Sequence, residues 1–167
     1  MFGFPVEGFI GTTYQKKGME DNWTDCFLNL RIIPQLSKLK PNILEKETIN
    51  KVIEKIKLEL LSHKPINSLV HGDLWSGNAG MDKSGKGVIF DPASWWADNE
   101  VDIAMTKLFG GFRKEFYEEY YKIFPIKQGF DKRIIIYNFY HILNHANMFG
   151  GSYFNQVKSY VKAILNM

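Results

Sequence analysis

The sequence has little cysteine and no long apolar run. Its 167 residues include a single cysteine, Cys26, so no disulfide can form within the chain and no Cys/His cluster suggests a metal centre. The first residues lack the basic and apolar parts of a signal peptide. No apolar stretch approaches the roughly 20 residues needed to span a bilayer. These absences predict a cytoplasmic protein that has no membrane partner.

Charge and composition are those of an ordinary globular protein. The net charge is +3, with 45% hydrophobic and 23% charged residues. The lysines are scattered rather than massed in one stripe, which argues against a nucleic-acid partner. We expect one folded domain over residues 1–167.

The first part of the chain is expected to change from extended to helical structure. Residues 1–20 are glycine-rich and have no helical period, so we expect an extended segment with a short strand around Val6–Ile10. A helix is predicted to begin at Asp21 or Asn22, both good N-caps. Pro34 is expected to kink or interrupt that helix.

Helical periodicity dominates the rest of the chain, apart from one short β element. Ser68–Val70 is an apolar approach to His71, and Gly87–Asp91 has the composition of a strand. The turn-rich residues 82–87 predict a hairpin before that strand. The fold class is therefore α+β and mainly α. Helices are expected at 45–61, 99–109, 113–124, 131–149 and 152–165.

The most informative segment reads His71-Gly-Asp-Leu-Trp-Ser-Gly-Asn78. It matches the phosphoryl-transfer signature H-x-D-L-x-x-x-N, with Asp73 at the base position and Asn78 at a metal-ligand position. Asp91 follows at the end of a short apolar strand. Phosphoryl transfer needs one carboxylate to accept the proton of the attacking hydroxyl, and oxygen ligands that hold Mg²⁺ against the phosphates. The pattern predicts a kinase that uses ATP and Mg²⁺.

Differences from the protein-kinase pattern favour a small-molecule substrate. Position 72 is glycine rather than the arginine that pairs with a phosphorylated activation loop. Asp91 is followed by Pro-Ala instead of Phe-Gly, and no Ala-Pro-Glu follows. These features indicate a kinase that acts on a small hydroxyl compound.

The blocks around this motif resemble those of the fructosamine/ketosamine 3-kinase family. They are His71–Asn78, Asp91-Pro-Ala-Ser-Trp-Trp96, Glu100-Val-Asp-Ile-Ala-Met105 and Leu108-Phe-Gly-Gly-Phe112, and the resemblance extends over essentially the whole chain. It implies a protein-kinase-like fold in which residues 1–167 are the C-terminal catalytic lobe. It also implies phosphorylation of the sugar 3-hydroxyl of ketosamines, after which the unstable product releases the amine.

The resemblance also implies roles for individual residues. Asp73 would be the catalytic base, while Asn78 and Asp91 would bind Mg²⁺ and, through it, the phosphates of ATP. Trp75 would line the substrate pocket. Three acidic residues would frame its rim: Asp98, Glu100 and Asp102. The chain reads Ala-Asp-Asn-Glu where many members read Gly-Asp-Arg-Glu, which leaves the substrate itself open.

The resemblance further implies a small N-terminal lobe that covers the ATP phosphates and supplies a lysine. No stretch before Asp73 has that character, and Gly8-Phe-Ile-Gly11 is not the glycine-rich G-x-G-x-x-G. We expect this ATP-gripping lobe to come from a longer gene product or from a partner chain. Two alternatives stay open: a non-catalytic remnant that only binds, and a kinase of the aminoglycoside or choline type.

Several aromatic and histidine residues are open to more than one interpretation. His141 and His145 share a helix face, and we interpret them as core or hydrogen-bonded residues rather than metal ligands. His63 is expected to be solvated, and His71 to brace the catalytic loop. The pair Trp95–Trp96 fits cleft lining and packing equally well.

Overall fold

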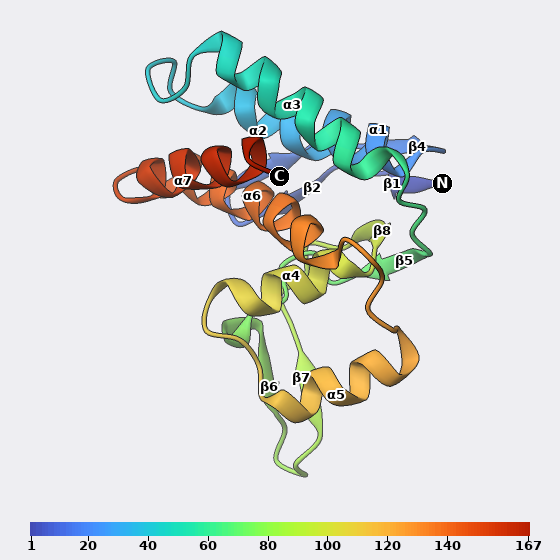
Figure 1. Ribbon diagram of the computed structural model, residues 1–167. Coiled ribbons are helices and arrows are strands. Elements are labelled where there is room, and N and C mark those ends of the chain that lie inside the picture. The colour runs from blue at the N-terminus through green and yellow to red at the C-terminus, as the bar shows by residue number, and fades with distance from the viewer.

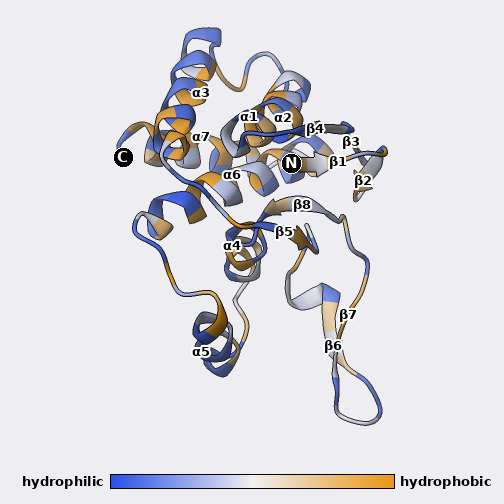
Figure 2. Ribbon diagram, turned by 90° about the vertical axis from the view of Figure 1, so that its right-hand side faces the viewer, coloured by the Kyte–Doolittle hydropathy of each residue, from blue (hydrophilic) through white to orange (hydrophobic).

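Helices form most of the molecule (Figure 1), and the turned view of Figure 2 shows the strands toward one side of them. The computed structural model describes all residues from 1 to 167. The helices are α1 (Trp23–Phe27), a π-helix (Leu28–Ile32), α2 (Ile33–Lys38), α3 (Lys46–Leu61), α4 (Glu100–Leu108), α5 (Lys114–Ile123), α6 (Phe130–Phe149) and α7 (Tyr153–Leu165). None of them combines the length and the apolar character needed to cross a bilayer.

The five helices predicted from periodicity are all present, and each end lies within one residue of its predicted position. Their amphipathic faces are long enough to carry a clear 3.6-residue period. Helices α6 and α7 pack against each other, and α4 crosses α6 on its other side. The expected fold class, mixed α+β and mostly helical, is confirmed.

The first helical segment differs from its prediction. Asn22 caps it as expected, its side chain accepting from the Asp25 amide at 3.1 Å. Pro34 does not interrupt the chain, because a π-helical turn precedes it. The Ile33 amide donates to the carbonyl of Leu28, five residues back. This wider turn places Pro34 in the first turn of α2, where a missing N–H costs little.

Strands are more numerous than predicted. They are β1 (Phe2–Phe4), β2 (Gly8–Ile10), β3 (Thr13–Gln15), β4 (Gly18–Glu20), β5 (Asn67–Val70), β6 (Ala79–Met81), β7 (Gly87–Ile89) and β8 (Trp95–Asp98). A four-stranded sheet has the order β4-β1-β8-β5, and β2–β3 and β6–β7 form separate antiparallel hairpins. Strand β2 lies within the expected strand region. Strands β1, β3 and β4 have three residues and β8 has four, too few to show a clear alternation, which is why they were not predicted.

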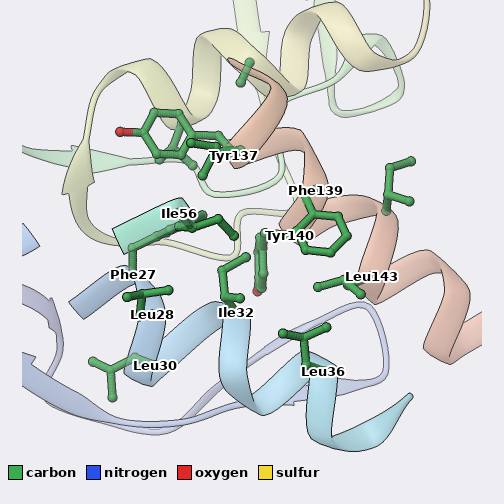
Figure 3. Close-up of a cluster of buried hydrophobic side chains, with 14 of the residues drawn as sticks. Phe27, Leu28, Leu30, Ile32, Leu36, Ile56, Tyr137, Phe139, Tyr140 and Leu143 are labelled. Atoms are coloured by element: carbon green, nitrogen blue, oxygen red, sulfur yellow. The ribbon is translucent and has the colours of Figure 1, made fainter. Parts of the chain in front are cut away.

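The core lies between the N-terminal helices and α6. Figure 3 shows Phe27, Ile32 and Ile56 facing Tyr140 and the neighbouring side chains of α6. Trp95 is fully buried and stacks on Trp23 with ring centroids 5.6 Å apart, whereas Trp96, the next residue along β8, is 39% exposed. Of the two readings left open for this pair, packing therefore holds for Trp95.

The β6–β7 hairpin and α5 project away from the helices, as Figures 1 and 2 show. No residue of α5 is buried. The hairpin pairs Ala79 with Ile89 at its base. Because Asn78 and Asp91 flank this hairpin in sequence, its base brings the two candidate metal ligands to the same place.

Candidate active site

Asp73 and Asn78 are joined directly by the turn between them. A short 3₁₀ turn at Ser76–Asn78 folds the chain back, with the Asn78 amide donating to the carbonyl of Trp75 at 3.0 Å. The side-chain nitrogen of Asn78 then donates to the Asp73 carbonyl at 2.9 Å and to its carboxylate at 3.2 Å. With its nitrogen engaged in this way, Asn78 keeps its amide oxygen for another partner.

Asp91 reaches the same place from the other end of the hairpin. The Phe90 amide donates to the main-chain carbonyl of Asn78 at 3.1 Å. Asp91 itself is exposed and adopts the left-handed conformation, with φ of 55°, which is uncommon outside glycine but tolerated by aspartate. The expected hairpin is confirmed, and it places Asp91 beside the Asp73 loop.

His71 connects the two segments. Its Nε2–H donates to the carbonyl of Phe90 at 2.9 Å, and its Nδ1 accepts from the Asp73 amide at 3.3 Å. These bonds define a neutral imidazole with its proton on Nε2. The expectation that His71 braces the loop is confirmed.

Asp102 binds the backbone at the start of the loop. Its carboxylate accepts from the backbone amides of His71 at 2.7 Å and of Gly72 at 2.9 Å. Gly72 has φ of +83°, and a Cβ there would lie 2.2 Å from the carbonyl oxygen of Ala93. The Ala93 amide in turn donates to the His71 carbonyl at 2.9 Å. Glycine at position 72 is therefore a steric requirement of this loop.

A cavity of about 290 Å³ opens beside Asp73 and Trp75. The Trp75 ring is 36% exposed and lies edge-on to Phe109, with ring centroids 6.0 Å apart. Helix α6 closes the opposite wall with Asn144 and His145, and the β2–β3 turn contributes Ile10 and Gly11. The other lining residues are Met105, Met148, Phe149 and Tyr153.

His145 is the site residue whose position the sequence did not reveal. Its Nδ1–H donates to the carbonyl of His141 at 2.8 Å, which leaves Nε2 without a partner in the chain, on a residue of the cavity wall. The interpretation as a hydrogen-bonded helix residue is confirmed, and His141 is fully buried as expected of a core residue. The available signal was that Asn144, His145, Met148 and Phe149 share one face of α6.

The surroundings of Asp73 suit a proton acceptor. Burial raises the pKa of its carboxyl above the ordinary range, and the nearby Asp91 adds to this rise. His145, His71 and the hydrogen bond from Asn78 lower the pKa and so offset part of the effect. A carboxylate with a raised pKa is a stronger base than a free aspartate. This is the electrostatic character that abstraction of a hydroxyl proton requires.

Asp98 and Glu100 face the interior of the protein. Asp98 Oδ2 accepts from the Tyr137 hydroxyl at 2.6 Å and lies 2.7 Å from His63 Nε2. Glu100 pairs with Arg133 through two hydrogen bonds of 2.6 and 2.8 Å. Neither these carboxylates nor that of Asp102 lines the cavity beside Asp73.

The reading of His63 as a solvated residue is wrong, because only 7% of its side chain is exposed. Its partner Asp98 lies 35 residues further along the chain, on the strand that pairs with β5. The two residues meet because β5, which follows His63, runs antiparallel to β8, which ends at Asp98. A pairing at that sequence distance leaves no local signal.

The oxygen groups near Asp73 fit a magnesium ion. Mg²⁺ prefers carboxylate and amide oxygens and is commonly held by one or two protein side chains together with substrate phosphates. The exposed carboxylate of Asp91 and the uncommitted amide oxygen of Asn78 are such donors. These two residues would hold the ion, with Asp73 next to them.

The same fold occurs in solved structures of other proteins. An aminoglycoside phosphotransferase structure matches 99% of this chain and 57% of that chain with a TM-score of 0.56, at 14% sequence identity. At that identity the match defines the fold alone. The family follows from a second comparison, in which the fructosamine kinase family matches residues 1–167. The chain belongs to the fructosamine kinase family.

Individual relatives show the same resemblance over part of their length. A probable ketoamine kinase of Vibrio parahaemolyticus is 42% identical over 165 residues, which is 99% of this chain and 57% of that protein. Ketosamine-3-kinase of Mus musculus is 36% identical, over 91% of this chain and 50% of that protein. A candidate fructosamine-3-kinase structure from Haemophilus somnus has a TM-score of 0.90 at 29% identity, over 98% and 56%. The chain thus spans little more than half of these relatives.

Proposed function

We propose that this chain carries the catalytic site of an ATP-dependent kinase that phosphorylates a sugar hydroxyl of ketosamines. The observation that carries the proposal is the position of Asp73. Its carboxylate is bonded to the Asn78 amide, lies within electrostatic reach of Asp91, and lines a cavity of about 290 Å³. A base, two oxygen ligands and a substrate-sized space therefore meet at one loop.

Each residue has a proposed role in the transfer. Asp73 orients the substrate hydroxyl and accepts its proton as the oxygen attacks the γ-phosphorus of ATP. Trp75 presents a flat apolar ring to one face of the sugar. His145, through Nε2, accepts a hydrogen bond from a second sugar hydroxyl and so fixes the orientation of the ring. Positioning of this kind is the main contribution of a protein to phosphoryl transfer.

Asn78 and Asp91 are the proposed holders of Mg²⁺, which when bound would neutralise negative charge on the transferred phosphoryl group. The three acids predicted for the pocket rim have a different proposed role. Asp102 positions the loop through the amides of His71 and Gly72. Asp98 bonds to Tyr137 and Glu100 bonds to Arg133. These two pairs fix β8 and α4 in place behind the loop.

We further propose that residues 1–167 form the C-terminal catalytic lobe of the kinase. The relatives extend well beyond the matched region, since the chain covers 57% of the Vibrio protein. The remainder, supplied by a longer product or by a partner chain, would cover the ATP phosphates. Binding of the metal and nucleotide can therefore be tested on this chain alone, whereas full turnover would require the remainder as well.

Calorimetric titration of MgATP into the folded chain tests the nucleotide site. We expect binding that requires Mg²⁺ and is lost in Asp91→Ala, because that variant removes a charged metal ligand. Asp131→Ala, which removes an exposed aspartate from the first turn of α6, is the matched control and should bind as the parent does. Binding that is indifferent to Asp91, or no binding by the folded chain, would contradict the proposal for this polypeptide.

A substrate panel tests the reaction on the chain together with the remainder of the kinase, with formation of a sugar phosphate followed by ³¹P NMR. We expect phosphorylation of fructosyl-lysine but not of an aminoglycoside or choline, and a loss of about 10²-fold or more in Asp73→Asn, which retains the shape of the side chain but cannot act as a base. Preference for an aminoglycoside or choline would assign the chain to the other kinase type. MgATP binding without phosphorylation of any compound would support the non-catalytic alternative.

A further inference from the structure

A second cavity, of about 260 Å³, is lined in part by Gly8 and Phe9 of β2 and shares no lining residue with the Trp75 cavity. Its polar lining comes from Arg31 of the π-helix, Gln15, Lys16 and Ser94. Its apolar lining includes Phe4, Val6 and Phe9. The cavity holds two basic side chains and no acidic one, so it presents positive charge to whatever enters.

Arg31 has unused hydrogen-bonding capacity in this cavity. Only 2% of the residue is exposed, and its guanidinium stacks on the Trp95 ring at 4.1 Å from the centroid. Both of its hydrogen bonds use Nη1, which donates to the carbonyls of Leu30 at 2.9 Å and Lys16 at 3.3 Å. Nε is buried without a partner. Nε has no contact with solvent, so Nη2, which makes no hydrogen bond within the chain, is the guanidinium nitrogen left for a partner in the cavity.

The charge of Arg31 is also uncompensated. No carboxylate forms an ion pair with it, and burial lowers the pKa of the guanidinium because desolvation disfavours its charged form. Stacking on Trp95 supplies part of the missing stabilisation. A buried cation without an anion is costly, and residues of this kind are normally paired.

We propose that this cavity binds a small carboxylate with an apolar body, held by Nη2 of Arg31. A hydrogen bond from a charged guanidinium nitrogen to a carboxylate is strong, and Lys16 adds a second positive charge to the lining. Phe4, Val6 and Phe9 provide the apolar wall that an inorganic anion would not use. The site is separate from the proposed kinase centre, although Pro92 and Ala93 of its wall directly follow Asp91.

The arginine Nε–H resonances give a direct test, because the chain has only three arginines. The wild-type chain is titrated with sodium benzoate at constant ionic strength, and the Arg31 signal is assigned through bonds to its own backbone. We expect a saturable shift of Arg31 and none of Arg113, which is exposed. Benzamide, the uncharged counterpart of benzoate, should leave the Arg31 signal in place.

A variant and a second anion complete the experiment. Lys16→Ala should weaken benzoate binding by about threefold, the size expected of a partly exposed charge, whereas Lys17→Ala, whose side chain is 61% exposed, should not. Absence of an Arg31 shift with benzoate, or an equal shift of Arg113, overturns the site. Inorganic phosphate binding more tightly than benzoate overturns the assignment of a carboxylate.

Discussion

Gly72 and Ala93 approach so closely that a Cβ on Gly72 would lie 2.2 Å from the carbonyl oxygen of Ala93. This contact joins the loop that carries Asp73 to the segment that follows Asp91. Backbone atoms cannot withdraw as a flexible side chain can, so any larger residue at position 72 must displace one of the two segments. The Asp73 loop and the Asp91 segment are thus held in register by a glycine.

Gly72→Ala is expected to lower the free energy of unfolding by roughly 2–4 kcal/mol, because the substitution adds both a left-handed alanine and a backbone collision. Urea unfolding measures the change. Gly85→Ala is the matched control: Gly85 has φ of +81°, but a Cβ there meets only the Met81 Cε at 3.9 Å. The control should lose about 1–2 kcal/mol. Equal losses in the two variants would show that the contact with Ala93 contributes nothing.

Arg133→Met is expected to destabilise the protein by about 3–5 kcal/mol, because it leaves the Glu100 carboxylate buried without its cation. Both side chains of the pair are less than 10% exposed. Combining the change with Glu100→Gln should recover much of the loss, since no buried charge then remains. Lys132→Met, the neighbouring position with a 47% exposed side chain, should cost less than about 1 kcal/mol. Additive effects of the two substitutions would argue against a coupled pair.

The Asp73 carboxyl is expected to titrate above the ordinary aspartate value of about 3.9. Burial disfavours its charged form, and Asp91 adds to this effect, so Asp91→Asn should move the midpoint down. The ¹³C shift of the Asp73 carboxyl reports both midpoints. Because the proposed base must be ionised, activity should fall as the pH drops through this raised midpoint, at a higher pH than for an ordinary aspartate. A midpoint at or below the ordinary value would contradict the environment described for Asp73.

Cys26 is expected to be inert in the folded protein. Burial raises the pKa of its thiol to about 12, and none of the residue is exposed, so the reactive thiolate is absent at neutral pH. A chromogenic disulfide reagent should therefore react only when the chain unfolds, and should release one equivalent in denaturant, where the single thiol is accessible. Rapid reaction under native conditions would show that the core around Cys26 opens readily.

The extent to which the sequence predicted the fold follows from the length of each element. Helices such as α3 and α6 extend over several turns, so their buried faces repeat often enough to be recognised. The strands of residues 1–20 have three residues each, too few to show a period; β1 pairs with β4 nearby and also with the distant β8. The π-turn before Pro34 has no sequence pattern of its own, because the residues before it and after it are helical as well.

The candidate site divides in the same way. The spacing between Asp73 and Asn78 was sufficient to predict that they act together, because five residues allow only a tight turn, and the hairpin signal at 82–87 indicated that Asp91 would return to them. The sequence did not indicate that His145 would face Asp73 across a cavity, or that Asp98 would turn inward to His63 and Tyr137.

Local order along the chain thus determined the helices, the loop of Asp73 and its resemblance to a kinase family, since neighbouring residues cannot be far apart in space. The tertiary structure alone decided which distant groups meet. Arg31 stacks on Trp95 beside an open cavity, and Asp102 receives the amides of His71 and Gly72. Such contacts join residues 30 or more positions apart, and packing of the whole core sets them rather than any local preference.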